Sequence, residues 1–218
     1  MAKVNFPLTL PAYYRKFLNS HVQILSFEER KELKLVLLKY YNLQPASTST
    51  FGHTLMDKLC IIETLLIEIG LGKAAVLSVL LQEPVENKII SIENIEKIFQ
   101  VNVSSIINGM SRVRELYEKN TAIDTENFRK LFLTFAEDIR VILIIIAEHL
   151  QMMRTLDALD NEKVQNIARE SSFLYAPLAH RMGLYAIKTE LEDLSLKHTN
   201  REIFKEIADL HSGDQVVI

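Results

Sequence analysis

The chain has 218 residues with only 6 glycines and 5 prolines, less than half of the roughly 26 that average usage would give. Because sheet proteins and disordered chains need these residues for turns and loops, their scarcity argues against a β-sandwich, a β-barrel, a glycine-rich phosphate-binding fold and a disordered tail. The formal net charge of −3 gives no electrostatic footprint for nucleic acid, and the single cysteine, Cys60, excludes a disulfide framework and a multi-cysteine zinc site.

Helical signals begin with a capping box, in which the Ser26 hydroxyl and the Glu29 carboxylate each satisfy a free backbone amide. The apolar residues after it repeat at helical spacing, at Leu33, Val36, Leu37 and Tyr40. After a polar loop over 44–52, the pattern predicts helices over 55–69, 73–81, 92–99 and 103–119. The second of these helices is expected to end near Pro84, and Ser91 to cap the third.

The second half of the chain is also predicted to be helical. One long apolar helix is expected over 126–153, and its middle is apolar on nearly every face, as is typical of the centre of a bundle. Asp160 or Asn161 caps a helix that runs to about residue 175, and another helix is expected over 184–198. Thr199 begins a second capping box, which opens a last helix. The pattern as a whole predicts an all-α bundle of about ten helices without strands.

No zinc HExxH motif, P-loop, nucleophile elbow or dinucleotide fingerprint is present, and no two histidines lie three or four residues apart. Two places carry acids in an apolar setting. Glu83 and Glu86 follow the apolar run 76–81, where they are either solvated residues at a helix end or ligands for a hard cation. Glu148 follows the most apolar helix segment, where a carboxylate needs a partner, a metal or water.

No segment is expected to enter a membrane. The longest apolar stretch, 141–147, is far shorter than the roughly 20 residues that cross a bilayer. The first residues lack the apolar core of a signal peptide. We therefore expect a soluble cytoplasmic protein.

Several strings of residues carry a resemblance to a known family. They begin near residue 126 and comprise Asn127, Arg129, Arg154, the string Tyr175-Ala176-Pro177-Leu178-Ala179-His180-Arg181-Met182-Gly183, and Glu190-Leu191-Glu192-Asp193-Leu194. With a weaker match over 25–109, they resemble the RelA/SpoT family, whose members make and degrade the alarmones guanosine tetra- and pentaphosphate. The resemblance implies the family's N-terminal, all-helical hydrolase domain of the HD superfamily over 1–195. It also implies a connecting helix over 196–218, which would lead toward a synthetase domain.

In that family the hydrolase domain holds one Mn²⁺ through two histidines and two aspartates, and the metal activates water for attack on the 3′-pyrophosphate. The resemblance places the metal ligands at Lys58, Gln82, Glu83 and Glu148, and an assisting Glu-Asp pair at Glu86 and Asn87. It places degenerate nucleotide-binding positions in a loop at Ser49, Thr50 and Gly52, and at Met152 and Thr155. Helical spacing puts these last two on one face with Glu148 and Leu159, a face that retains little to recognise a phosphate. Both imidazole ligands are missing and a protonated lysine cannot ligate, so we expect no metal in this domain.

Lys58 leaves two interpretations open. Its ammonium replaces the metal electrostatically by pairing with Glu83 or Glu148, or its side chain reaches past apolar surface to solvent.

The resemblance implies a catalytically inactive hydrolase domain with a structural or regulatory role in the stringent response. Its expected partner is the protein's own synthetase domain, a GTP pyrophosphokinase that would use Mg²⁺ to transfer pyrophosphate from ATP to GTP or GDP. One alternative is a residual Mn²⁺-dependent hydrolase that uses Glu83, Glu86 and Glu148. Another is a module that binds the alarmone, a guanine nucleotide, without cleaving it.

Overall fold

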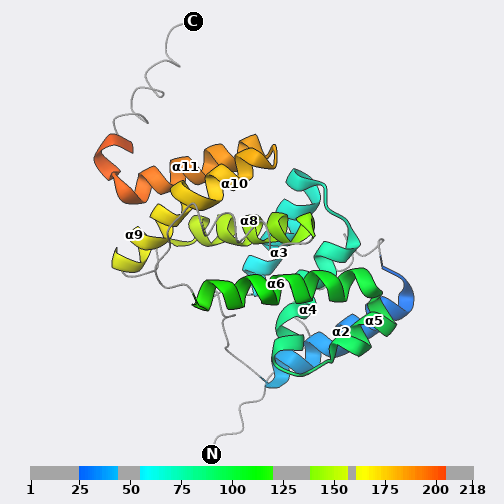
Figure 1. Ribbon diagram of the computed structural model, residues 1–218. Helices are drawn as coiled ribbons and strands as arrows, with labels where there is room; N and C mark the ends of the chain where they lie inside the picture. The colour runs from blue at the N-terminus through cyan, green and yellow to red at the C-terminus, as the bar shows by residue number, and fades with distance from the viewer. Residues whose placement is uncertain (1–24, 44–54, 120–137, 157–160, 205–218) are drawn as a thin grey trace, which may run out of the picture. The chain divides into compact units, whose positions relative to one another are not determined.

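The computed structural model describes residues 25–43, 55–119, 138–156 and 161–204. Helices make up the regular structure of these residues, and no strand occurs among them (Figure 1). In chain order the elements are α2 (Phe27–Leu43), α3 (Leu55–Glu63), the π-helical segment η2 (Thr64–Ile69), α4 (Lys73–Glu86), α5 (Ile92–Phe99), α6 (Val101–Lys119), α8 (Ile139–Arg154), α9 (Asn161–Glu170), the π-helical segment η4 (Ser171–Tyr175), α10 (Ala176–Arg181) and α11 (Tyr185–Thr199). The prediction of an all-α fold is confirmed.

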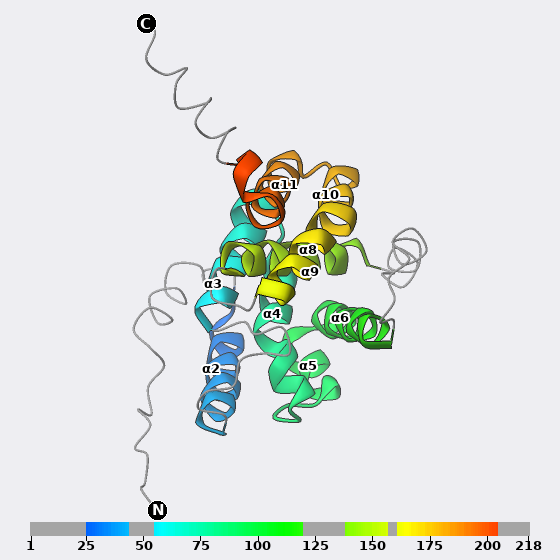
Figure 2. The ribbon, with the colours of Figure 1, turned by 90° about the vertical axis from the view of Figure 1, so that its left-hand side faces the viewer.

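The described residues up to 119, together with 138–144, form one compact unit. Both ribbon views place α4 between α2 and α6, and α5 packs on α6 (Figures 1 and 2). Every residue of α4 from Ala75 to Pro84 is buried. The polar side chains near the end of this helix therefore lie inside the unit, where they need partners.

The predicted capping box at the start of α2 is confirmed in both directions. The Glu29 N–H donates to Ser26 Oγ at 3.2 Å, and the Ser26 N–H donates to Glu29 Oε2 at 2.7 Å. Lys73, in the first turn of α4, donates to the other oxygen of Glu29 at 2.8 Å. Burial raises the pKa of Glu29, but the hydrogen bonds from Lys73 and Ser26 outweigh it, so the pKa lies below its ordinary value.

Two of the predicted helix boundaries need small corrections, and one predicted cap is confirmed. Pro84 does not end α4, which continues to Glu86, because a proline so near the end of a helix removes only one backbone hydrogen bond. The α6 helix begins at Val101, two residues before its predicted start. Ser91 caps α5 as predicted, and its Oγ accepts from the N–H of Asn94 at 3.3 Å.

The prediction of one continuous helix over 126–153 is wrong at Asp138. The α8 helix begins at the next residue, where the Asp138 carboxylate accepts from the N–H of Arg140 at 2.9 Å and from its guanidinium at 2.6 Å. An aspartate that bonds a backbone amide two residues on favours a helix start over a helix interior. Residues 126–137 lie outside the described residues.

The α6 and α8 helices approach each other closely at Gly109. A Cβ added to Gly109 would lie 2.7 Å from Cγ2 of Val141, a residue that is itself fully buried. Only glycine lets the two helices come this close without displacing the valine.

Residues 145–156 and 161–204 belong to a second compact unit. Pro177 lies in the first turn of α10, where its missing N–H costs no helical hydrogen bond. Buried Ser195 of α11 donates to the carbonyl of Ala168 in α9 at 2.6 Å, and its hydroxyl lies 2.7 Å from that of Ser172. These contacts tie α9, η4 and α11 together.

Thr199 is not the cap of a following helix, as the sequence predicted. Its hydroxyl donates back to the carbonyl of Ser195 at 2.8 Å, so it closes α11. Asn200 is the cap, since its Oδ1 accepts from the N–H of Ile203 at 3.3 Å. The rest of the predicted last helix, beyond residue 204, lies outside the described residues.

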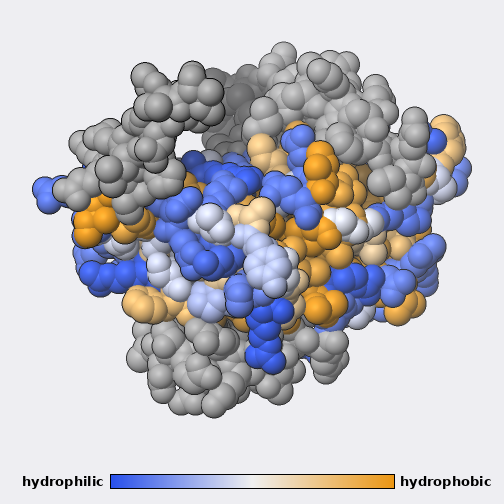
Figure 3. Space-filling model, turned by 90° about the horizontal axis from the view of Figure 1, so that it is seen from above, coloured by the Kyte–Doolittle hydropathy of each residue, from blue (hydrophilic) through white to orange (hydrophobic). Residues whose placement is uncertain are grey.

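The surface of the described residues carries apolar and polar groups side by side. Several large apolar side chains are exposed, including Phe27, Ile67, Phe173 and Tyr185. On the face drawn in Figure 3, hydrophobic residues adjoin hydrophilic ones. None of the helices within the described ranges is long and apolar enough to cross a membrane.

Candidate functional site

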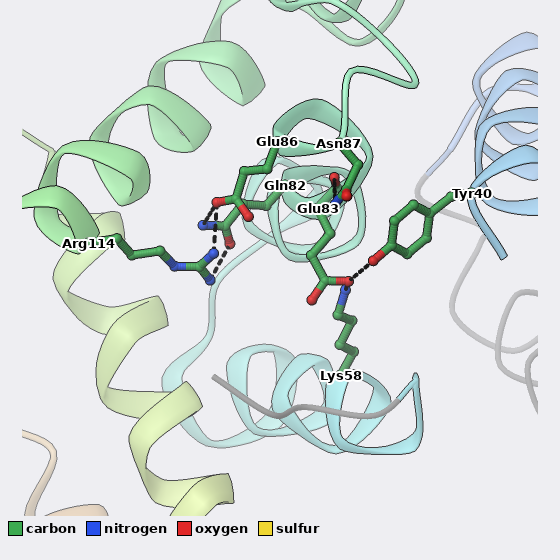
Figure 4. Close-up of polar contacts among 7 residues, drawn as sticks. All are labelled: Tyr40, Lys58, Gln82, Glu83, Glu86, Asn87 and Arg114. Atoms are coloured by element: carbon green, nitrogen blue, oxygen red, sulfur yellow. Dashed lines mark hydrogen bonds and ion pairs between the residues drawn. The ribbon is translucent and has the colours of Figure 1, made fainter. Parts of the chain in front are cut away.

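The centre of the candidate site is a buried ion pair that joins three helices. Glu83 of α4 accepts hydrogen bonds at Oε2 from the Lys58 ammonium of α3 and from the Tyr40 hydroxyl of α2, the latter at 2.9 Å (Figure 4). Only 7% of the Lys58 side chain and 6% of the Glu83 side chain are exposed. Of the two interpretations of Lys58, the structure shows the pairing, with Glu83 as its partner.

We call Tyr40, Lys58 and Glu83 the Glu83 cluster. The two oxygens of its carboxylate have different surroundings. Among the described residues, nothing donates a hydrogen bond to the second carboxylate oxygen, Oε1 of Glu83, although that atom is buried. The Lys58 nitrogen also lies over the Tyr40 ring, 6.0 Å from its centroid, at the outer limit of a cation–π contact. A carboxylate and an aromatic face therefore both lie beside the ammonium.

A second cluster lies on the neighbouring face of α4. Arg114 of α6 donates from Nη1 to Glu86 Oε1 at 2.8 Å and from Nη2 to Gln82 Oε1 at 2.9 Å, and Gln82 Nε2 donates to the same Glu86 oxygen at 3.1 Å (Figure 4). The Arg114 side chain is 10% exposed and that of Glu86 is 28% exposed. The guanidinium, the amide and the carboxylate thus form a closed triangle of hydrogen bonds.

The spacing of residues along α4 explains why two clusters form. Gln82 and Glu86 lie four residues apart and share one helix face, which meets α6. Glu83 is rotated by one residue and faces α2 and α3. Asn87, which follows the helix, donates its side-chain amide to the Glu83 carbonyl at 2.9 Å and so satisfies a terminal carbonyl of α4.

The predicted helix face with Glu148, Met152 and Thr155 is only partly correct. Glu148 is buried and Met152 half-buried, and both lie on α8 within the second unit. The helix ends at Arg154, and the Thr155 N–H donates to the carbonyl of Met152, three residues back, at 3.1 Å as the chain turns. Thr155 is therefore not on the helix, and Leu159 lies outside the described residues.

Several residues of the family-like strings have structural contacts in the second unit. Arg154 makes a two-pronged contact with Glu190, from Nε to Oε1 at 2.6 Å and from Nη2 to Oε2 at 2.7 Å. The buried Tyr175 ring stacks on the His149 ring with centroids 3.6 Å apart. Gly183 has a φ of 77°, a left-handed conformation that glycine adopts without strain.

The other members of these strings are buried, partly exposed, exposed or outside the described residues. His180 contacts the Tyr185 ring edge-on at 5.6 Å, and Pro177 is half-buried. The exposed members are Arg154, His180, Arg181, Gly183, Glu192 and Asp193. The members outside the described residues, together with the predicted nucleotide loop, are Ser49, Thr50, Gly52, Asn127 and Arg129.

Two members of the clusters had no functional signal in the sequence. Tyr40 belongs to the apolar helical repeat of the sequence, and it is buried, but its hydroxyl also donates a hydrogen bond to Glu83. Arg114 lies 28 residues from Glu86 in an ordinary charged segment, and only tertiary structure brings them together. Within the described ranges, no three His, Cys, Asp or Glu side chains are grouped so that they would hold a metal ion.

Comparison with known proteins agrees with the resemblance found in the sequence. The chain is 37% identical to a probable guanosine-3′,5′-bis(diphosphate) 3′-pyrophosphohydrolase of Synechocystis over 78% of the chain and 22% of that protein. It is 31% identical to the bifunctional (p)ppGpp synthase/hydrolase SpoT of Escherichia coli K12 over 93% of the chain and 30% of that protein. It is 36% identical to a GTP pyrophosphokinase of Myxococcus xanthus over 63% of the chain and 19% of that protein.

The chain thus spans less than a third of the length of these relatives. The model of the HD domain family matches residues 39–185, which is more than half of the chain and includes both clusters. The chain therefore belongs to the HD domain family, as an HD domain of the RelA/SpoT type.

Proposed function

We propose that this chain is a hydrolase-type HD domain that does not hydrolyse the alarmone and that serves a structural or regulatory role in a longer RelA/SpoT protein. The observation that carries the proposal is the Lys58–Glu83 ion pair. Both residues occupy positions at which the resemblance to the family expects ligands of a catalytic Mn²⁺. The hydrolysis in that family needs the metal to activate water.

The donor chemistry at these positions supports the proposal. A protonated lysine has three N–H donors and no lone pair to offer a metal. Glu83 Oε2 already accepts from Lys58, and the amide oxygen of Gln82 already accepts from Arg114. These residues fit an internal cation better than they fit a divalent metal ion.

The second cluster supports the same conclusion for the assisting acid. Glu86 stands where the family has a catalytic carboxylate, and its Oε1 accepts from both Arg114 and Gln82. This Glu86 oxygen already accepts two hydrogen bonds, so it has no unused lone pair with which to take a proton from water. Asn87, its neighbour, has an amide in place of an acid and cannot take up a proton.

The role that remains is mechanical. The two clusters link α4 to α2, α3 and α6 by charged hydrogen bonds inside the first unit, so they hold this part of the fold in one arrangement. In the longer protein we expect this domain to restrain or position its own synthetase domain, which would carry the Mg²⁺-dependent GTP pyrophosphokinase activity. The relative from Myxococcus xanthus is named for that activity.

A residual Mn²⁺-dependent hydrolase is the second candidate, since relatives from Synechocystis and E. coli are named as hydrolases. Incubation of the 218-residue chain with guanosine tetraphosphate and Mn²⁺ separates the candidates, with the SpoT protein of E. coli as the active reference. We expect no release of pyrophosphate above the rate without protein. Release that is lost in the Glu86→Gln and Glu148→Gln variants would overturn the proposal. Saturable binding of the nucleotide without release would assign a sensing role instead.

A further inference from the structure

We propose that Glu83 and Tyr40 form a buried binding site for an ammonium ion, and that the Lys58 side chain is the occupant which the chain itself supplies. The proposal concerns what the site recognises, so it stands whether or not the domain hydrolyses the alarmone. It rests on the geometry of the Glu83 cluster alone (Figure 4).

Two groups beside the Lys58 nitrogen are of the kinds that recognise ammonium ions in proteins. Glu83 supplies a carboxylate that is 6% exposed, and Tyr40 supplies an aromatic face with its ring centroid 6.0 Å from the nitrogen. A carboxylate offers charge and an acceptor, and the negative face of a ring attracts a cation. The Tyr40 hydroxyl donates to the same carboxylate oxygen at 2.9 Å and holds it toward the nitrogen.

The carboxylate has acceptor capacity that Lys58 and Tyr40 leave unused. Oε1 of Glu83 is buried, and within the described part of the chain no donor reaches it. A buried carboxylate oxygen without a donor is costly, so this atom favours a small donor placed beside it. An ammonium with free movement, unlike one fixed at the end of a side chain, can orient its N–H groups toward both oxygens.

The position of Lys58 shows how the occupant could be exchanged. Lys58 comes from α3, whereas Glu83 and Tyr40 come from α4 and α2, so truncating the lysine leaves the other two groups in place. Lys58→Ala removes three methylene groups and the ammonium, which together have the composition of n-propylammonium. This free ion therefore matches the cavity in both charge and volume.

The test is a thermal unfolding series on the 218-residue chain. Lys58→Ala should unfold at a lower temperature than the wild type, and n-propylammonium should raise its midpoint saturably by at least about 2 °C. Tetramethylammonium at the same concentration should raise it less, because that ion has the charge but no N–H donor. The wild type, whose own lysine fills the site, should not respond to either ion.

Two further variants separate recognition by the carboxylate from simple filling of the cavity. Lys58→Ala combined with Glu83→Gln should lose the response, because the carboxylate is gone while the cavity remains. Lys58→Gln, which fills most of the cavity, should fold even if the alanine variant does not, should be less stable than the wild type and should not respond. An equal response to both ions, a response that survives Glu83→Gln, or a Lys58→Gln variant as stable as the wild type would overturn the proposal. A response of Lys58→Ala to Mn²⁺ but not to n-propylammonium would assign the site to metals instead and would also contradict it.

Discussion

Glu83 and Glu86 lie three residues apart on α4, yet their carboxylates have cationic partners on different helices. Glu83 pairs with Lys58 of α3, and Glu86 pairs with Arg114 of α6. Each acid near the end of this buried helix is thus neutralised by a cation of the same unit. Of the alternatives that the sequence left for these acids, a solvated helix end fits Glu86, which is exposed, whereas Glu83 is buried in an internal ion pair.

The first prediction concerns the cost of breaking the Lys58–Glu83 pair. Lys58→Met should lower the free energy of unfolding by about 3–5 kcal/mol, because it leaves a buried carboxylate without its counter-charge. Lys58→Met combined with Glu83→Gln should lower the free energy of unfolding by less, since the amide is neutral and can still accept from Tyr40. Urea unfolding followed by circular dichroism measures both values.

The control for this prediction is an exposed pair of the same type. Lys188 and Glu192 lie 2.5 Å apart, with 31% and 46% of their side chains exposed. Lys188→Met should change stability by no more than about 0.5 kcal/mol. If Lys58→Met behaved like Lys188→Met, the Lys58 ammonium would have to be solvated in solution.

The second prediction concerns the contact between α6 and α8. Gly109→Ala should destabilise the chain by about 1–3 kcal/mol, because the new Cβ would lie 2.7 Å from Cγ2 of Val141, and a valine side chain is too short and stiff to move aside. The cost of the clash outweighs the roughly 1 kcal/mol by which alanine is favoured over glycine in a helix.

Gly72→Ala is a control without a clash, since nothing lies within 4 Å of a Cβ added there; because Gly72 is the N-cap of α4 and alanine is a poorer cap, it should cost no more than about 1 kcal/mol. Adding Val141→Ala to Gly109→Ala should relieve the clash but leave the cost of a smaller core residue. A stabilising effect of Gly109→Ala would mean that the helices lie farther apart than described.

The third prediction concerns acid pH and the start of α8. Hydrogen bonds from Arg140 hold the pKa of Asp138 below its ordinary value of 3.8. A lowered folded-state pKa adds stability that is fully present above the unfolded-state pKa and is lost as the pH falls through the folded-state pKa. The stability difference between the wild type and Asp138→Asn should therefore be constant above about pH 5 and shrink below about pH 4.

Urea unfolding at a series of pH values between about 2.5 and 6 tests this dependence. Asparagine is a suitable replacement because it still accepts a hydrogen bond at a helix start but does not titrate in this range. A difference between the two proteins that grows as the pH falls would contradict the assigned ion pair.

The fourth prediction concerns the two-pronged contact of Arg154 with Glu190. Arg154→Lys keeps the charge but loses one of the two hydrogen bonds, since an ammonium cannot match both carboxylate oxygens in one plane. With 31% and 37% of the side chains exposed, the loss should be at most about 1 kcal/mol. Arg154→Met should cost at least as much, and chemical denaturation should rank the two variants in that order.

The sequence predicted those features that depend on neighbouring residues. The Ser26–Glu29 capping box and the Ser91 cap depend on residues three apart, and both are present. The sequence predicts the start of α8 wrongly, because the apolar repeat in the residues before it indicates a continuous helix. Asp138, which favours a helix start, is a weaker local indication. Thr199 was misassigned because a threonine also bonds back to the helix that it ends.

The site was harder to predict, because its contacts span long stretches of sequence. Lys58 could be singled out from the resemblance, but its choice of Glu83 depends on how α3 packs against α4. Arg114 and Tyr40 carry no motif, and they reach the acids of α4 only after α6 and α2 have packed against it. Long-range pairing of this kind is set by tertiary structure, not by local pattern.

The central claim is that an internal cation stands where the family's metal would be, and binding of Mn²⁺ to the chain tests it most directly. The electron paramagnetic resonance signal of free Mn²⁺ falls when the ion binds to protein. The account predicts that the 218-residue chain leaves this signal unchanged, or lowers it equally in the wild type and in Glu83→Gln. A one-to-one loss of signal in the wild type that is abolished by Glu83→Gln would contradict it.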